Sequence, residues 1–248
     1  MSTRLFSLLL AVCALFVSIT AQAQKTDAPA TAPAAKAPAP ASKAPVTVDP
    51  FSQAIGEAMA KMDANDLDGA IAKLTDAINL DPKKSAPYVF RASVYFQKKM
   101  WPQAEADFKT ASKLDPKNIV IQFNIPEVKF VQKQYDAARP GYLALKDDPQ
   151  MGDLAAYKVF LCDLLAGHEA LAQKERDAFN TVNTKPSYYF SNAAWELVHK
   201  NNEKAQSWLV SVANIYPSAK ISYYALPLKD LGYLPIPAPS SMPSATGI

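Results

Sequence analysis

Cys162 and His168 are the residues best suited to covalent chemistry, and they lie six positions apart. A thiol beside an imidazole could act as a nucleophile with its general base. Side chains six positions apart on one helix point to different faces, so these two are not expected to meet. The apolar run VFLCDLL around Cys162 favours a small buried core residue over a reactive thiol.

Histidines and carboxylates are the next candidates, for metal binding or acid–base catalysis. The chain has two histidines, His168 and His199, and neither has further ligands at metal-site spacing around it. Asp147, Asp148 and Asp153 are expected to be solvated turn residues rather than an acid–base pair. The sequence therefore predicts no metal site.

Motifs that carry catalysis or hold a cofactor are missing from the sequence. There is no His-Glu-x-x-His, no Gly-x-Ser-x-Gly, no phosphate-binding Gly-Lys-Ser or Gly-Lys-Thr and no glycine-rich dinucleotide loop. Lysines and arginines (26) nearly balance aspartates and glutamates (23), and the two signs are mixed along the chain. No basic stripe could neutralise a run of phosphates. We expect a non-enzymatic protein without a cofactor or a nucleic-acid partner.

The first 23 residues resemble a secretory signal peptide. Arg4 provides a positive charge, residues 5–19 are almost wholly apolar, and Ala21 and Ala23 suit a signal peptidase that cleaves before Gln24. Two alternatives remain, namely a membrane anchor, for which the apolar run is short against the roughly 20 residues of a span, and lipid attachment at Cys13. Cleavage predicts a periplasmic or secreted protein with Cys162 as its single thiol and no internal disulfide.

Residues 24–50 and 235–248 have a composition unsuited to a packed core. The first segment is rich in alanine and proline and is expected to be a disordered linker, which either holds the rest of the chain away from a membrane or wall or has no task. The second contains four prolines and is expected to be a disordered tail.

Residues 85–118 read as one helix–turn–helix unit of 34 residues. Counting from Ser85, small residues stand at positions 8, 20 and 27, aromatic residues at 4, 11 and 24, and proline at 32; they are Tyr88, Ala92, Tyr95, Ala104, Phe108, Ala111 and Pro116. Small residues let two antiparallel helices approach closely, and the aromatic rings fill the space beside them. This pattern resembles the tetratricopeptide repeat.

The same count divides the chain into about five repeats, at 51–84, 85–118, 119–152, 153–185 and 186–217. In the first repeat, Asn65 and Asp66 supply the turn and a candidate N-cap. In the third, Pro126 and Pro140 should kink or restart their helices. Residues 218–234, interrupted by Pro227, should form a capping helix. The expected fold class is all-α, a tetratricopeptide-type solenoid of about five helix–turn–helix repeats with a C-terminal capping helix.

The resemblance implies a scaffold that binds another protein or a peptide in a concave groove. Positions 5, 9 and 12 of the first helix in each repeat commonly face that groove. The residues expected there are apolar, and they suit a helix or an extended segment with apolar anchors: Ile55, Met59, Met62, Val89, Phe96, Phe123 and Phe130. The alternative is that a tightly wound superhelix, or the N-terminal segment, covers these side chains.

The fifth repeat is unusually aromatic and supports a second functional reading. Tyr188, Phe190, Trp195 and Trp208 could line a pocket for a small ligand or a cell-wall glycan. Packing in the core is the more common role of such residues. The predicted function is therefore an exported bacterial scaffold whose protein partner is unknown, with a small-ligand or glycan-binding module as the alternative.

Overall fold

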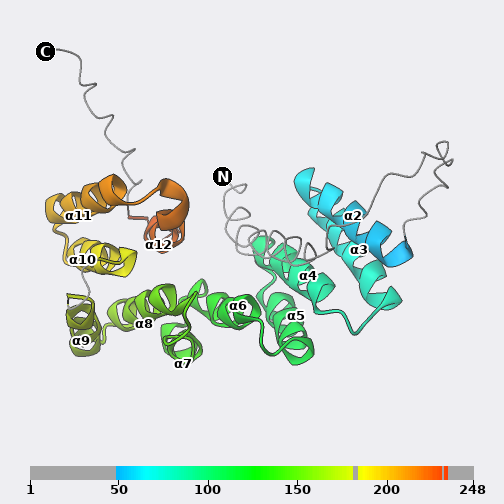
Figure 1. Ribbon diagram of the computed structural model, residues 1–248, viewed down its shortest axis with the longest axis horizontal. Coiled ribbons are helices and arrows are strands. Elements are labelled where there is room, and N and C mark those ends of the chain that lie inside the picture. Colours follow the sequence, from blue (N-terminus) through cyan, green and yellow to red (C-terminus); the bar gives the residue numbers. More distant parts are fainter. Residues whose placement is uncertain (1–48, 181–183, 231, 234–248) are drawn as a thin grey trace, which may run out of the picture. The chain divides into compact units, whose positions relative to one another are not determined.

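The computed structural model describes residues 49–180, 184–230 and 232–233, and this part of the chain is entirely helical (Figure 1). It contains eleven α-helices and no strand, which confirms the all-α prediction. The expected signal peptide, most of the expected linker and the expected tail lie outside these residues.

The chain divides into two compact units, with the boundary in the sequence between Val120 and Ile121. The first unit contains α2 (Pro50–Asp63), α3 (Leu67–Leu80), α4 (Ser85–Gln97) and α5 (Trp101–Leu114). Each of these helices packs on the next one along the chain. The core around the first helix pair includes Ala58, Met62, Ala70, Leu74 and Val94.

The second unit contains seven helices, of which α6 begins at the boundary. They are α6 (Ile119–Phe130), α7 (Tyr135–Leu143), α8 (Gly152–Ala166), α9 (Glu169–Asn180), α10 (Pro186–Val198), α11 (Asn202–Ile215) and α12 (Ser218–Asp230). Helix α8 packs on α7, α9 and α10, and α10 also packs on α9, α11 and α12.

A left-handed residue ends the first helix of every predicted repeat. The residues are Asn65, Lys99, Lys133, Gly167 and Lys200, with φ between 56° and 81°. The residue after each one donates its backbone N–H to the carbonyl five residues earlier. In the first repeat Asp66 donates to Lys61 at 2.8 Å, and in the fifth Asn201 donates to Glu196 at 2.8 Å. This 6→1 bond closes a helix C-terminus in the Schellman motif. The turn therefore recurs at intervals of 34 residues, and of 33 at the last step.

The second helix of each predicted repeat carries an alanine at position 20, and all five are fully buried: Ala70, Ala104, Ala138, Ala172 and Ala205. A side chain with one methyl group at this point lets the paired helices approach closely. The five alanines therefore lie in buried positions, as the small-residue pattern of the repeat requires. Asp66 also caps α3 as predicted, because its Oδ1 accepts a hydrogen bond from the backbone N–H of Gly69 at 2.9 Å.

Prolines lie inside three helices without dividing them. Helix α6 runs through Pro126, α7 runs through Pro140, and α12 runs through Pro227. The expectation that the capping helix is interrupted is therefore wrong, and of the two outcomes expected for α6 and α7, a kink or a restart, the restart does not occur. Each proline removes one backbone donor, but the remaining bonds and the packing of the apolar faces keep the helical path.

Candidate functional site

The groove residues predicted in the first unit are mostly buried. Met59 is 43% exposed and Ile55 is partly buried, whereas Met62, Val89 and Phe96 are each below 9% exposed. Met62 belongs to the core, and Ile55 packs against that core. Of these five side chains, Met59 alone offers a large apolar surface to a partner.

The two groove residues predicted in the second unit, Phe123 and Phe130, lie in its interior. Both rings contact the ring of Tyr142, at centroid distances of 5.2 and 6.2 Å. The ammonium group of Lys158 lies 4.1 Å from the centroid of Phe130, in cation–π geometry. A partner could reach these phenylalanines only by displacing their neighbours.

Lys158 is a buried cation, 5% exposed, that no motif in the sequence indicates. It forms an ion pair with Glu127 of α6, which also accepts a hydrogen bond from the hydroxyl of Tyr142 at 2.7 Å. Burial, and then the nearby Glu127, raises the pKa of Tyr142 well above its usual value. Both the ammonium and the carboxylate have partners, so this cluster links α6, α7 and α8 without leaving a charge unpaired.

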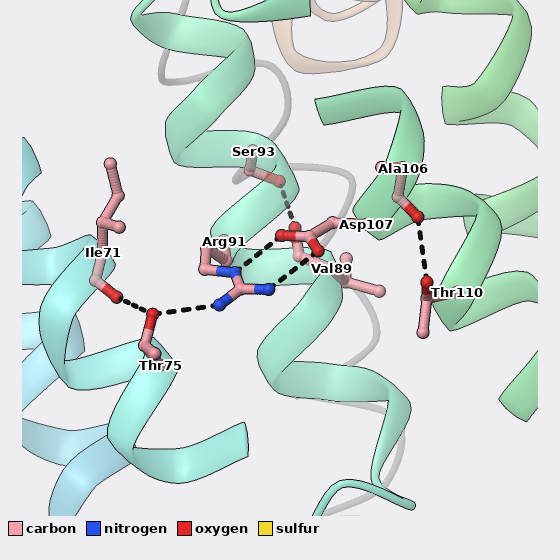
Figure 2. A network of polar contacts seen from close by, with 8 residues as sticks. All are labelled: Ile71, Thr75, Val89, Arg91, Ser93, Ala106, Asp107 and Thr110. Atoms are coloured by element: carbon pink, nitrogen blue, oxygen red, sulfur yellow. Dashed lines mark hydrogen bonds and ion pairs between the residues drawn. The ribbon is translucent and has the colours of Figure 1, made fainter. Parts of the chain in front are cut away.

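Arg91 of α4 connects three helices of the first unit (Figure 2). Its Nε and Nη2 donate to the two carboxylate oxygens of Asp107 at 2.7 and 2.9 Å, and its Nη1 donates to Thr75 Oγ1 at 2.9 Å. The hydrogen bonds to Asp107 raise the pKa of Arg91. A two-point contact of this kind fixes the orientation of both side chains, so the network has a structural role.

The pair has a counterpart with exchanged charges in the first repeat. Glu57 and Lys73 occupy positions 7 and 23 there, as Arg91 and Asp107 do in the second repeat, and they form an ion pair at 2.7 Å. Opposite charges 16 residues apart in both repeats are the sequence signal for this contact. The first helix carries the negative charge in the first repeat and the positive charge in the second, and in both repeats the paired helix carries the opposite charge.

No nucleophilic site forms around Cys162. The thiol is 1% exposed, and burial raises its pKa to about 12. His168 instead directs Nδ1 toward the carboxylates of Asp136 and Asp163, at 3.6 and 3.7 Å. The predictions of a core cysteine and of no contact between thiol and imidazole are thus in keeping with the geometry. No group of three potential metal ligands occurs in the part of the chain that the structure describes.

Asp153 departs from the expectation of a solvated turn residue. It lies in the first turn of α8 and is half-buried. Its two oxygens accept hydrogen bonds from Ser187 Oγ at 2.6 Å and from the hydroxyl of Tyr224 at 2.7 Å. The expectation is wrong because two later helices, α10 and α12, return to this point. Asp148 is a turn residue as expected, and it caps the turn at Gln150 and Met151.

Comparisons with known proteins agree with this repeat geometry. No protein-family model matches the chain. The structure is similar to that of PilW, described as a widely conserved type IV pilus biogenesis factor, with a TM-score of 0.52 and 18% identity over 74% of this chain and 86% of that one. It is also similar to that of MamA, with a TM-score of 0.52 and 14% identity over 77% of this chain and 98% of that one. A third similar structure is that of Pseudomonas aeruginosa pilF, with a TM-score of 0.51 and 16% identity over 73% of this chain and 91% of that one.

The chain has the tetratricopeptide-repeat fold. Its sequence is also 32% identical over 77 residues to a DnaJ homolog subfamily C member 7 homolog of Dictyostelium discoideum. That match covers 31% of this chain and 14% of the relative's length. None of the helices in the described ranges is both long and apolar enough to cross a membrane.

The fifth tetratricopeptide repeat divides its aromatic residues between core and surface. Phe190 is fully buried, as the core reading requires. Tyr188 and Trp208 are half-buried and meet edge to face at 5.5 Å, and Tyr189 contacts both rings. Tyr216 adjoins this group through Tyr189 at 6.3 Å. These four residues form a partly accessible aromatic cluster on α10, on α11 and at the C-cap of α11.

Trp195, on the same repeat, contacts two cationic or titratable side chains, those of His199 and Arg176. The imidazole of His199 stacks on its indole ring at 4.4 Å, and the guanidinium carbon of Arg176 lies 4.1 Å from the ring centroid. His199 Nε2 is 2.9 Å from Glu169 Oε1. The hydrogen bond to Glu169, followed by that to the Trp195 carbonyl, raises the pKa of His199. This contact joins α9 to α10.

Proposed function

We propose that the protein is a non-catalytic scaffold of the bacterial cell envelope that binds a protein or peptide partner through its first unit. Stacked helical repeats present an extended surface in place of a single catalytic cleft, and partner binding is the usual use of that surface. The signal-like first 23 residues support export to the periplasm or beyond. The similar fold of a type IV pilus biogenesis factor fits an envelope location.

The exposure of Met59 is the observation that carries this proposal. A methionine side chain that is 43% exposed on the first repeat helix, beside the partly buried Ile55, presents adaptable apolar surface. It also occupies a position that commonly faces the groove in tetratricopeptide repeats. The partner would anchor an apolar side chain of a helix or an extended segment against these two residues.

Site-specific crosslinking tests this assignment. A photo-crosslinking amino acid replaces Met59 in one chain and Leu80 in a matched control, because Leu80 is also apolar and is 53% exposed, at the end of α3. Both chains are expressed with their N-terminal segment in a bacterium, and adducts are recovered from the envelope fraction. We expect a discrete protein adduct from position 59 and none from position 80.

The same adducts from both positions, or no adduct from position 59, would remove the proposed surface. Unmodified chain supplied in excess before irradiation should suppress formation of the adduct, whereas a Met59→Asp chain supplied in the same way should not. Circular dichroism should be unchanged in all these chains, since Met59 is a surface residue. Turnover of a substrate that is lost on substitution of Cys162 or His168 would contradict the non-catalytic assignment.

A small-ligand or cell-wall-glycan module is the second candidate function, favoured by the cluster of Tyr188, Tyr189, Trp208 and Tyr216. Half-buried aromatic rings can stack on the apolar face of a sugar ring while their edges stay packed. Titration with soluble cell-wall fragments should then change the emission of Trp208. A response that persists in a Trp208→Phe chain, or no response at all, would count against this candidate.

A further inference from the structure

Helix α12 docks through one continuous apolar face. Ile221, Tyr224, Ala225 and Leu228 are buried, at the spacing i, i+3, i+4 and i+7 that defines one side of a helix. Ser222, between the first two of them, and Lys229, directly after the last, are exposed. The helix packs on α10 and α11 and also reaches α8, which belongs to the fourth repeat.

Tyr224 is the centre of this contact. Its hydroxyl donates to Asp153 Oδ2 at 2.7 Å, and its ring lies 5.7 Å from the rings of both Tyr157 and Phe190. The plane of Tyr224 is inclined by 20° to that of Phe190, so these two rings are stacked. Ser187 Oγ holds the second oxygen of Asp153 at 2.6 Å. The carboxylate is thereby oriented to receive a tyrosine hydroxyl.

The residues beneath α12 occupy groove positions of the repeat. Tyr157 and Phe190 stand at position 5 of the fourth and fifth repeats, as Ile55 and Val89 do in the first and second. An amphipathic helix against such a surface, with anchors at i, i+3, i+4 and i+7, is a recurrent mode of peptide recognition. Here the chain supplies both the surface and the helix.

The internal helix fits this surface incompletely. The hydroxyl of Tyr157 is fully buried under the contact and has no hydrogen-bond partner among the described residues. A buried polar group without a partner costs free energy that a better-matched occupant would recover. Pro227 lies inside α12 and removes one of its backbone hydrogen bonds. Both features favour an occupant that can be displaced.

We propose that the surface formed by Asp153, Tyr157, Ser187 and Phe190 is a second peptide-binding site, whose external ligand is an amphipathic helix that places a tyrosine hydroxyl on Asp153. Helix α12 is the internal competitor for this site. The inference rests on the proposed function in that the protein binds peptide partners, but it uses different residues, in the other unit. A ligand with a hydrogen-bond acceptor near Tyr157 would bind in preference to α12.

The test uses the full chain and a fluorescent peptide with the sequence of residues 218–230. Fluorescence anisotropy measures its affinity for the unmodified chain, for a Tyr224→Ala chain, for an Ile221→Ser, Leu228→Ser chain and for a Ser222→Ala control. Loss of the internal contact should raise peptide affinity about tenfold or more in the first two variants, since a hydrogen bond to a charged group is at stake. The control should match the unmodified chain.

Two further measurements identify the contact. Adding Asp153→Ala to the Tyr224→Ala chain should lower the affinity again about tenfold, and so should a peptide with phenylalanine in place of the tyrosine at position 224. Hydrogen exchange should show faster exchange in α12 of the two loosened chains. Equal affinity for all chains, or no binding by either loosened chain, overturns the inference.

These outcomes are independent of the crosslinking experiment. Peptide binding without an adduct at position 59 would support the second site and remove the first. An adduct at position 59 without peptide binding would do the reverse.

Discussion

Gly141 of α7 lies directly against the ring of Pro126 of α6. A Cβ added to Gly141 would come within 2.9 Å of the proline's Cβ and 3.0 Å of its Cγ. In three of the other repeats the position of Pro126 holds an alanine: Ala58, Ala92 and Ala193. The third repeat therefore places its large residue on the first helix and its smallest residue on the facing helix.

Gly141→Ala should destabilise the protein by about 1 to 3 kcal/mol, because the added methyl group overlaps a rigid ring in a packed contact. Gly56→Ala is the matched control, since nothing lies within 4 Å of its added Cβ. That change should stabilise α2 by about 0.5 to 1 kcal/mol through helix propensity. Urea denaturation followed by circular dichroism measures both free energies of unfolding.

The same experiment with Pro126→Ala shows whether the two residues act as a pair. If the close contact is the cause, Gly141→Ala should cost much less in a Pro126→Ala chain. Additive effects of the two substitutions would mean that the proline is not what limits position 141.

The lysines at the repeat turns offer a second prediction. Lys99 and Lys133 are exposed and adopt φ of 59° and 61°, a conformation that costs an L-residue about 1 kcal/mol and costs glycine almost nothing. Each Lys→Gly substitution should therefore stabilise the protein by about that amount. Gly167→Ala, at φ of 81° with open space around it, should destabilise it similarly. Melting temperatures that move the other way would show that the lysine side chains make stabilising contacts.

Breaking the Arg91 network should lower the free energy of unfolding much more than breaking its counterpart, the Glu57–Lys73 pair of the first repeat. Asp107→Ala leaves a mostly buried guanidinium without its carboxylate, and should cost about 3 kcal/mol. Lys73→Ala breaks an exposed ion pair and should have no measurable effect. Arg91→Lys should also destabilise the protein, since an ammonium group cannot bond both oxygens of Asp107 and Thr75 in the same geometry. Similar effects of Asp107→Ala and Lys73→Ala on urea denaturation would refute the distinction.

The sequence predicted the repeats well because their constraints are local and recur. An alanine such as Ala70 or Ala104 must be small wherever two helices cross closely, so its spacing shows the period and the pairing. The same holds for the turn residue Asn65 and the cap Asp66. These features depend on positions within one repeat, which the sequence shows directly.

The candidate site was predicted less well because accessibility depends on what covers a face. The period identified the helix face of Phe130, but it could not show that the ammonium of Lys158, from another repeat, lies on that ring. Asp153 was misjudged for the same reason, since its partner Tyr224 is 71 residues away. Contacts at that separation depend on how later helices such as α12 pack on earlier ones, which no single repeat encodes.

The contact between His199 and Trp195 gives a pH-dependent signal. A raised pKa means that folding favours the protonated imidazole, so the stabilising contact with Glu169 is complete below the ordinary histidine pKa of 6.5 and is lost as the pH rises through the higher folded value. A stacked imidazolium quenches indole emission more strongly than a neutral imidazole does. The emission of Trp195 should therefore increase with pH, with a midpoint above 6.5.

A His199→Gln chain isolates this titration, since it retains His168 and every tryptophan. The difference between its fluorescence–pH curve and that of the unmodified chain should contain one transition. Salt should lower the midpoint, because Glu169 and His199 are both largely exposed and their attraction is screened. Identical curves for the two chains, or a midpoint below 6.5, would show that Glu169 does not hold the proton on His199 in solution.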